Sequence, residues 1–422
     1  MICGATGSGK STAILNMIQD MQQVVILDQQ RHSTARAAYA IKSGILDDLD
    51  DPEKHVPFTL LPPETGIERD VQIEDFEEVL IGSRSKGNMD ENPLIQSVVN
   101  MWCRLLPPFW TIKRGLRMFR FGDEFKEAID LCTDEECRSW WLDQPMSPTV
   151  RDRNFAPAER ILSLLGTEAI ASRTYRGTNE FIGWIDQGYS FFAEGGQIIP
   201  QKALRLIQRT RLKQLNRYKS RGGKANFTII LEESEASGII GPAEAKAVQL
   251  LRKTGVSFVY VCQEPHWLDD QVTQIILNNT NKMWFRADSQ TIAEMAADDL
   301  MVMFQPYAIK ETTEMLRVID DKKYIDRKVV YFSPSEQHQL IQKWVMSLPV
   351  GAAFVRFGNR VRYVQFPKVD VQDPEQKRKK QTCLRETKSF STSTTSTQSP
   401  LNKPSSQKSS HRTPSPLDEF QD

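Results

Sequence analysis

The sequence lacks the features that mark a secreted or membrane-spanning chain. No signal peptide is visible in it, and its longest apolar stretch, SVVNMWCRLLPPFWTI, is too short to span a bilayer and is interrupted by Arg104 and two prolines. It also lacks net charge, since 54 Lys and Arg balance 54 Asp and Glu. Overall charge therefore selects no partner, and any contact with nucleic acid has to come from local charge.

Metal-binding cysteine clusters are missing as well. The six cysteines are widely spread, and only Cys132 and Cys137, in CTDEEC, lie close together. A structural zinc site needs a second pair or nearby histidines, and neither accompanies this pair. The pattern is typical of reduced thiols in a cytoplasmic protein, and we expect any membrane association to be made through partners.

A phosphate-binding loop stands at the start of the chain. Residues 4–11, GATGSGKS, fit the pattern G-x-x-x-x-G-K-[ST], in which small residues let successive backbone N–H groups turn inward around a phosphate. Lys10 is expected to reach the β- and γ-phosphates of ATP, and the Ser11 hydroxyl to bind Mg²⁺. The predicted nucleotide-binding residues are Gly4, Ala5, Thr6, Gly7, Ser8, Gly9, Lys10, Ser11 and Thr12.

The residues that follow the loop provide the context that the motif requires. Apolar residues at helical spacing in TAILNMIQDM predict a helix whose N-terminus points at the anion, and VVILD predicts a buried strand ending in Asp28. Only three residues precede Gly4, whereas strands usually have about five or six residues. We expect the first strand to be truncated, as an artefact of where the chain begins.

Two later strands end in polar residues suited to ATP hydrolysis. FTIILEE predicts a buried strand ending in Glu232 and Glu233, and VSFVYVC leads into Gln263. Such residues emerge at the carboxyl ends of the strands, where the sites of α/β sheets lie. We predict that Glu232 holds Mg²⁺, that Glu233 is the catalytic base for water, and that Gln263 orients the water or donates to the γ-phosphate.

Strands alternate with helices through most of the chain, which predicts a mainly parallel sheet covered on both faces. The predicted fold class is α/β, with a RecA-like P-loop NTPase core in two parts, residues 1–85 and 181–367. Residues 86–180 are predicted to form a helical insertion, because Trp, Leu and Phe recur there at helical intervals. Residues 368–422, rich in Ser, Thr, Lys and Pro, are predicted to be disordered.

A basic stripe is the candidate DNA contact. No acidic residue lies between Glu194 and Glu232, and four cations there recur at four-residue steps along one helical face: Arg205, Arg209, Lys213 and Arg217. The alternative, of equal weight, is a solvated helix face balanced by acids elsewhere in the fold. A second stretch, FWTIKRGLRMFRF, could stack on unpaired bases, but its aromatic residues are better explained as the core of a helical domain.

Three segments, GATGSGKST, IILEE and RKTGVSFVYVCQEP, resemble in this order the HerA/FtsK branch of P-loop motor ATPases, closest to the conjugative type IV secretion coupling proteins. Two later segments, ILNNTNKMWFRADSQ and LPVGAAFVRFGNRVRYVQFP, resemble further parts of that family. The resemblance implies a homo-oligomeric ring, a hexamer, that uses ATP and Mg²⁺ to translocate DNA through a central channel. It also implies secretion machinery in the membrane, reached through residues outside this chain.

The same resemblance implies a role for Arg252, which occupies the place of the family's arginine that stabilises transition-state charge in the neighbouring subunit. Arg286 is a second candidate, and an exposed cation at a helix end is the alternative for Arg252. Two departures from the family favour a different function: the acid pair is Glu-Glu where the family has Asp-Glu, and a complete first strand is missing before the loop. In a third departure, Asp28 is followed by two glutamines where the family often has Pro-Lys, which leaves a functional role of Asp28 open.

The alternative function is a nucleotide-gated switch or assembly ATPase with little turnover and no DNA translocation. A small-molecule P-loop kinase ranks below both, because the strand-end acids and Gln263 lie far downstream of the loop and suit a motor better.

Overall fold

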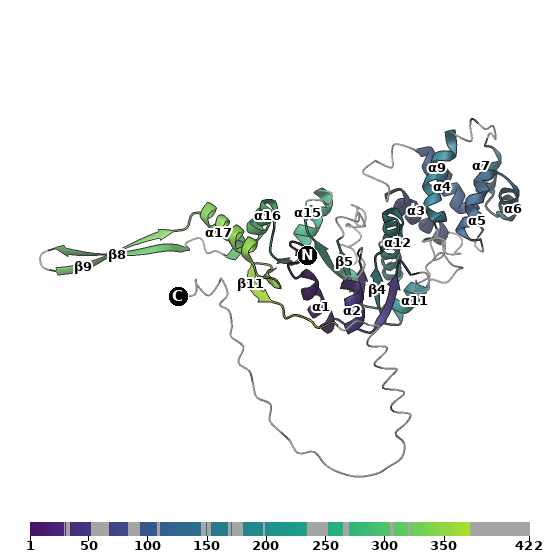
Figure 1. Ribbon diagram of the computed structural model, residues 1–422. Helices are drawn as coiled ribbons and strands as arrows, with labels where there is room; N and C mark the ends of the chain where they lie inside the picture. The colour runs from purple at the N-terminus through teal and green to yellow at the C-terminus, as the bar shows by residue number, and fades with distance from the viewer. Residues whose placement is uncertain are drawn as a thin grey trace, which may run out of the picture. The chain divides into compact units, whose positions relative to one another are not determined.

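In the computed structural model the chain forms two compact units. Figure 1 labels the helices and strands. The first unit comprises Met1–Cys3 and Met17–Thr280, and the second comprises Gly4–Asn16 and the residues from Asn281 onward. The residues that the structure describes are 1–28, 30, 34–51, 67–82, 93–107, 110–144, 149, 153–167, 170, 180–196, 199–233, 252–264, 270–303, 308–319 and 322–371.

The first unit contains a parallel sheet whose strands run in the order β1-β6-β5-β2-β4-β3. Its central strands are built from Val, Ile, Leu and Phe and are buried, as expected for a parallel sheet with both faces covered. The strand bounds are β1 Ile2–Cys3, β2 Val24–Leu27, β3 Gly44–Asp48, β4 Ser190–Glu194, β5 Thr228–Glu232 and β6 Ser257–Cys262.

The pairing register aligns the carboxyl ends of the strands that matter for the site. Cys3 of β1 pairs with Cys262 of β6, and Glu232 of β5 pairs with Val261 of β6. Strands β1, β5 and β6 therefore end at the same edge of the sheet. This is the edge at which α/β sheets bind their ligands.

Helices α2 (Thr34–Ile41), α12 (Gln201–Ser220) and α15 (Asp270–Asn279) and the short 3-10 helix η4 (Arg252–Thr254) also belong to the first unit. Helix α1 (Lys10–Asp20) starts in the second unit and ends in the first.

Between β3 and β4, all regular elements within the described residues are helical. All of them except α11 (Glu180–Asp186) contribute to one hydrophobic core, in which the buried ring of Trp141 stacks on Phe155, with ring centroids 5.5 Å apart. Part of α12 joins the same core through Leu204 and Ile207. The helices are α3 Ile67–Gly82, α4 Pro93–Leu105, α5 Ile112–Leu116, η2 Arg117–Arg120, α6 Asp123–Leu131, α7 Glu135–Leu142, α9 Ala156–Leu162, η3 Ser163–Gly166 and α11 Glu180–Asp186.

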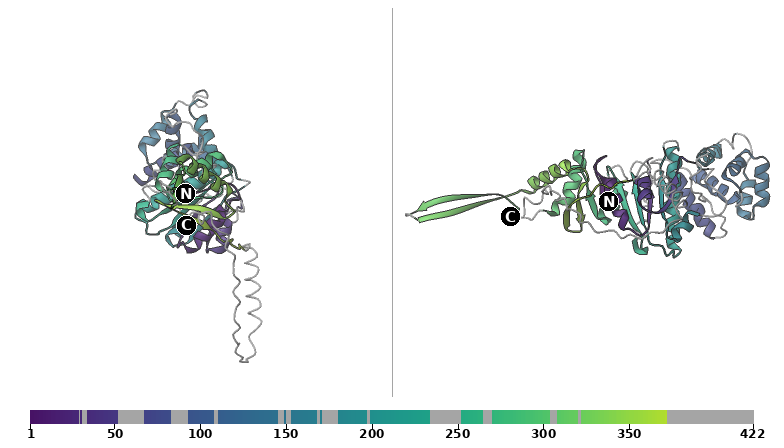
Figure 2. Two further views of the ribbon diagram at one scale, coloured as in Figure 1. Left: turned by 90° about the vertical axis from the view of Figure 1, so that its left-hand side faces the viewer. Right: turned by 60° about the horizontal axis from the view of Figure 1, so that its bottom comes forward.

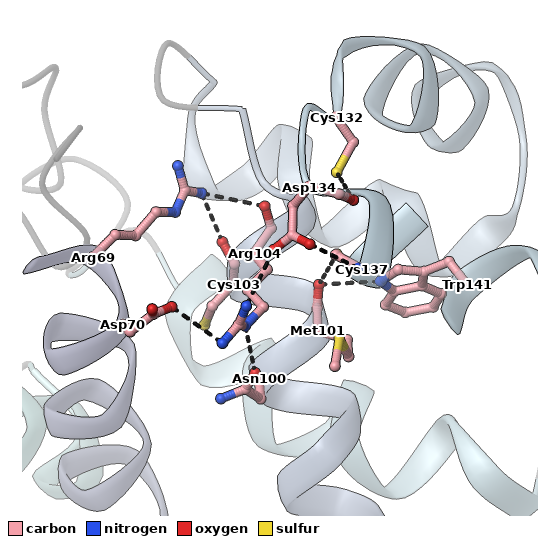
Figure 3. Close-up of polar contacts among 10 residues, drawn as sticks. All are labelled: Arg69, Asp70, Asn100, Met101, Cys103, Arg104, Cys132, Asp134, Cys137 and Trp141. Atoms are coloured by element: carbon pink, nitrogen blue, oxygen red, sulfur yellow. Dashed lines mark hydrogen bonds and ion pairs between the residues drawn. The ribbon is translucent and has the colours of Figure 1, made fainter. Parts of the chain in front are cut away.

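Arg104 connects three of these helices (Figure 3). Its guanidinium forms ion pairs of 3.1 Å with both Asp70 of α3 and Asp134, the residue that caps the N-terminus of α7. The other oxygen of Asp134 accepts the backbone N–H of Cys137 at 3.0 Å, and this bond is the main cause that lowers the pKa of Asp134. The thiols of Cys132 and Cys137 donate to the backbone carbonyls of Asp134 and Met101.

The second unit contains a small antiparallel sheet in which β10 (Ala352–Phe357) lies between β7 (Lys282–Trp284) and β11 (Arg360–Gln365). Helices α16 (Gln290–Leu300) and α17 (Pro334–Ser347) pack on one another, and η6 (Met301–Met303) follows α16. The buried carboxylate of Asp299 ties the sheet to α16, because it accepts the indole N–H of Trp284 at 2.9 Å and pairs with Lys282 and Arg356.

The second unit also contains a two-stranded antiparallel hairpin, β8 (Ile309–Ile319) and β9 (Lys322–Tyr331), which extends from the N-terminal end of α17 (Figure 2). At its base Lys310 forms a 2.5 Å ion pair with Glu336 of α17, and this contact is the main cause that lowers the pKa of Glu336 to about 2. Leu316 and Ile325 face each other across the hairpin and are 62% and 61% exposed.

The predicted fold class is confirmed, and the predicted strands ending at Asp28, Glu232 and Gln263 are present. The hairpin β8–β9 was not predicted. The domain boundaries at 85, 180 and 367 stay predictions. A helix predicted from PAEAKAVQLLRKTG falls mostly on residues 242–251, and the predicted disordered tail falls mostly on residues 372–422. Both ranges lie outside the described residues.

Candidate nucleotide site

The phosphate-binding loop is held in the second unit by backbone hydrogen bonds. Ala5 N–H donates to the carbonyl of Arg286 at 2.8 Å, directly after β7, and Gly351 N–H donates to the carbonyl of Ser8 at 2.9 Å, just before β10. Lys10 begins α1, and its ammonium donates to the carbonyls of Gly4 and Ala5 at 2.6 and 3.0 Å. These contacts fix the backbone of the loop and the position of the Lys10 side chain.

Glycine is needed at specific points of this loop. Gly7 and Gly9 have φ angles of 71° and 105°, which side-chain-bearing residues rarely adopt. A Cβ on Gly4 would lie 2.6 Å from the Cβ of Phe285, so the loop also packs too closely for a side chain at that point. Ser11 and Thr12 fall in the first turn of α1, where the helix N-terminus attracts anions.

The acid pair lies at the end of β5 in the first unit. Glu232 is 7% exposed, and its carboxylate accepts the hydroxyl of Thr34 at 2.7 Å. Glu233 has a left-handed backbone with φ of 49°, one of two positive values among the described non-glycine residues. Its carboxylate accepts the side-chain amide of Gln263 at 3.0 Å and that of Gln30 on its other oxygen.

The structure therefore brings together Glu233 and Gln263, which sequence reasoning placed in one site. The backbone carbonyl of Gln263 also accepts the thiol of Cys3 at 3.4 Å, and Cys3 is the residue from which the phosphate-binding loop continues at Gly4. The loop thus departs from the same edge of the sheet at which Glu233 and Gln263 lie.

Asp28, whose role the sequence left open, has a structural function. It is buried, and its two carboxylate oxygens accept the backbone N–H groups of Gln30 at 2.9 Å and Ala35 at 3.3 Å. It therefore holds the backbone at Gln30 and at the first turn of α2. Sequence reasoning missed Gln30 and Thr34, which this connection presents to the acid pair.

Further acidic residues line the ends of β3 and β4, and arginines neutralise them. Arg36 of α2 pairs with Asp48 at 2.7 Å and with Glu194 at 2.6 Å, and the hydrogen bond to Glu194 is the main cause that raises the pKa of Arg36. Asp47 pairs with Arg211 of α12, and both side chains are fully buried.

The predicted DNA-contacting face of α12 makes contacts inside the fold. Lys213 pairs with Glu78 of α3 at 2.5 Å, and Arg217 pairs with Asp75 of α3 at 2.5 Å. Arg209 is buried, and Arg205 is half-buried. The ion pairs give Lys213 and Arg217 a role in packing α12 against α3, and the role of the four cations in DNA binding stays a prediction.

The two arginine candidates differ in what the structure describes. Arg252 begins η4, and its side chain lies outside the described part of the structure. Arg286 follows β7, and its backbone carbonyl supports the loop through Ala5. Within the described residues there is no cluster of three or more His, Cys, Asp or Glu that could hold a metal ion, and no helix there is long and apolar enough to cross a bilayer.

This fold, with a glycine-rich loop between a strand and a helix, is the α/β fold of the RecA-like P-loop NTPases. Among solved structures, the chain is similar to the bacterial conjugative coupling protein TrwBdeltaN70, at 16% identity and a TM-score of 0.54, over 88% of this chain and 85% of that one. It is also similar to plasmid coupling protein TrwB in complex with ADP and Mg²⁺, at 15% identity and a TM-score of 0.54, over 88% of this chain and 86% of that one.

VirB4 of Thermoanaerobacter pseudethanolicus is similar at 10% identity and a TM-score of 0.53, over 87% of this chain and 89% of that one. No protein-family model and no curated protein matches the chain. The predicted resemblance to conjugative coupling proteins is thus confirmed at the level of the fold.

Proposed function

We propose that this protein is an ATP-hydrolysing motor of the coupling-protein type, which assembles as a homo-oligomeric ring, a hexamer, and translocates DNA. The observation that carries the proposal is the hydrogen bond between Glu233 and Gln263, made at the edge of the sheet from which the phosphate-binding loop departs. TrwB, whose fold the chain shares, has been solved with ADP and Mg²⁺ and with non-hydrolysable analogues of ATP and GTP.

Each residue has a defined task in this proposal. The backbone N–H groups of residues 4–12 and the Lys10 ammonium bind the phosphates. Glu233 takes the proton of the attacking water, and Gln263 orients that water. Ser11 and Glu232 offer a hydroxyl and a carboxylate, which are the oxygen ligands that Mg²⁺ prefers. The metal would neutralise charge on the phosphates when bound.

The ring, the DNA and the secretion machinery are the finer parts of the proposal. Arg252 is proposed to act on the nucleotide of the neighbouring subunit, so hydrolysis requires assembly. The basic face of α12, with Arg205, Arg209, Lys213 and Arg217, is the proposed DNA contact. We also propose that the protein works in the cytoplasm and meets membrane machinery through partners.

Steady-state ATP hydrolysis by the purified chain tests the proposal directly. The rate per subunit should rise with protein concentration and again when single- or double-stranded DNA is added. Lys10→Ala should reduce turnover by a factor on the order of 10³, because a principal charge contact to the phosphates is lost. Hydrolysis that ignored both DNA and protein concentration would contradict the motor, and an unchanged Lys10→Ala rate would contradict the site.

A nucleotide-gated switch is the second candidate, and one observation favours it. The acid pair is Glu232-Glu233, where the family that the sequence resembles has Asp-Glu. Turnover by Glu233→Gln separates the two functions. A motor loses most of its hydrolysis, whereas a slow switch hydrolyses ATP at the same low rate with and without the carboxylate.

A further inference from the structure

The connection between β2 and α2 touches both members of the acid pair. Gln30 donates its side-chain amide to Glu233, and Thr34 donates its hydroxyl to Glu232 at 2.7 Å. Asp28 anchors Gln30 itself, because it is only 1% exposed and accepts the backbone N–H of Gln30 at 2.9 Å.

Glu233 needs such support. Its backbone φ of 49° lies in the left-handed region, where residues with a Cβ are strained and persist only when surrounding contacts hold them. Its carboxylate accepts hydrogen bonds from two side-chain amides that follow different strands. Gln263 follows β6 and binds one carboxylate oxygen, and Gln30 follows β2 and binds the other.

Two amide donors on opposite oxygens define the plane of a carboxylate as well as its distance. Each carboxylate oxygen can accept more than one hydrogen bond, so an oxygen bound by an amide can still accept the proton of a water molecule. A single amide from Gln263 would leave the carboxylate free to rotate about that bond. Gln30 removes this freedom and directs the remaining lone pairs of Glu233 to one side.

We propose that Gln30 is a positioning residue that holds the Glu233 carboxylate in its working orientation, with Gln263 as the second arm of the same clamp. The inference rests on the proposed function, in which Glu233 is the base for the attacking water. Thr34 extends the arrangement to the neighbouring acid, because its hydroxyl donates to the carboxylate of Glu232 at 2.7 Å.

The kinetic signature of a positioning residue is a loss of kcat without a change in KM or nucleotide affinity. General-base catalysis accelerates a reaction by factors of roughly 10²–10⁴. A misplaced base loses part of this acceleration. We expect Gln30→Ala to lower kcat by about tenfold while the ATP affinity measured with a non-hydrolysable analogue stays the same. A merely structural residue would instead lower melting temperature and nucleotide affinity together.

Two variants make the test specific to the amide. Gln30→Glu keeps the shape of the side chain but replaces the N–H donor with a second carboxylate facing Glu233. It should therefore be slower than Gln30→Ala at neutral pH. Gln22→Ala is the matched control, because Gln22 is exposed and lies before the opposite end of the same strand. That variant should keep the wild-type kcat.

A double-mutant cycle locates the effect on Glu233. In a Glu233→Gln background, Gln30→Ala should lower the residual rate no further, because the carboxylate that Gln30 positions is gone. Wild-type kcat or a raised kcat in Gln30→Ala, or an equal loss in both backgrounds, would overturn this inference alone. The proposed function fails separately, if the wild-type chain shows no hydrolysis that depends on Lys10.

Discussion

Gly9 of the phosphate-binding loop lies against the backbone of Gly351, so closely that a Cβ on Gly9 would be 2.5 Å from the Gly351 nitrogen. Gly351 in turn donates its N–H to Ser8 in the same loop at 2.9 Å. The segment before β10, near the end of the described chain, therefore shapes the loop at its beginning. Backbone atoms cannot move aside as a flexible side chain can, so this contact leaves no room for substitution.

We predict that Gly9→Ala impairs the loop far more than Gly7→Ala. Both glycines have positive φ angles, which costs a side-chain-bearing residue about 1–2 kcal/mol. Only at Gly9 does the added methyl also collide with backbone, whereas nothing lies within 4 Å of the corresponding position on Gly7. Overpacking of this kind destabilises a protein by about another 1–3 kcal/mol.

Thermal unfolding and ATP-analogue binding measure the difference. Gly9→Ala should lose nucleotide affinity by at least about tenfold, and it should melt below Gly7→Ala. Equal effects of the two substitutions would mean that the loop can move away from Gly351.

Local patterns in the sequence are sufficient to predict the central strands of this fold. The loop, the strand ending in Glu232 and Glu233, and the strand before Gln263 were predicted because each is specified by residues adjacent in the chain. Gln30 and Thr34 were missed because their importance depends on β2 lying beside β5, which no local pattern reveals. The ion pairs of Lys213 and Arg217 likewise depend on acids of α3 that lie far away in the sequence.

The hairpin β8–β9 could not be predicted from the sequence for a different physical reason. Half-buried strands are recognised by alternation of apolar and polar residues, because one face meets a core. Both faces of this hairpin carry exposed side chains, including Met315 on one face and Leu316 on the other. Without a core on either side, its sequence has no such alternation to detect.

Replacing only one partner of the buried ion pair between Arg211 and Asp47 should strongly lower the free energy of unfolding. Both side chains are fully buried, and the guanidinium also lies over the ring of Phe191, 5.0 Å from its centroid. We predict that Arg211→Met destabilises the protein by about 3–5 kcal/mol, because it leaves the carboxylate of Asp47 buried without its cation. Denaturant unfolding gives this difference directly.

Replacing both partners tests the cause. The double variant Asp47→Leu with Arg211→Met should recover most of the loss, since apolar groups of similar volume can replace a buried ion pair. Arg327→Ala is the control, because its ion pair with Glu314 on the hairpin is largely exposed and should contribute less than about 1 kcal/mol. A double variant no more stable than Arg211→Met would show that shape, not charge, is what Arg211 supplies.

Arg252 can be tested by mixing inactive subunits. Arg252→Ala should bind nucleotide normally and yet lose turnover by a factor on the order of 10³, if its guanidinium acts on the neighbour's nucleotide. Lys10→Ala subunits keep Arg252 but are inactive because they bind the phosphates of the nucleotide poorly. Mixed in equal amounts, the two variants should recover part of the wild-type hydrolysis.

The mixing experiment also separates the candidate arginines. If Arg286 supplies the charge instead, Arg252→Ala alone stays active and Arg286→Ala takes its place in the rescue. Mixtures that stay as inactive as their components, for either arginine, would contradict hydrolysis between subunits.

The helices between β3 and β4 should lose stability at acidic pH, and this loss should originate at Asp134. Its pKa is lowered chiefly by the backbone N–H of Cys137 and then by the side chain of Arg104. A carboxyl whose pKa is lower in the folded than in the unfolded state stabilises the fold above its unfolded pKa, near 4. That stabilisation is lost as pH falls through the folded value. We expect Asp134→Asn to cost about 0.5–1 kcal/mol at neutral pH, a small figure because the side chain is partly exposed and screened.

The sign of the pH dependence is the decisive measurement. Because protonated Asp and Asn carry no charge, the difference in unfolding free energy between wild type and Asp134→Asn should shrink as the pH is lowered below about 4, the unfolded pKa, and through the lowered folded value. Glu135→Gln is the control, since Glu135 is exposed in the first turn of the same helix and should change stability by only a few tenths of a kcal/mol. A difference that stayed constant with pH would mean that Asp134 holds α7 by its shape and not by its charge.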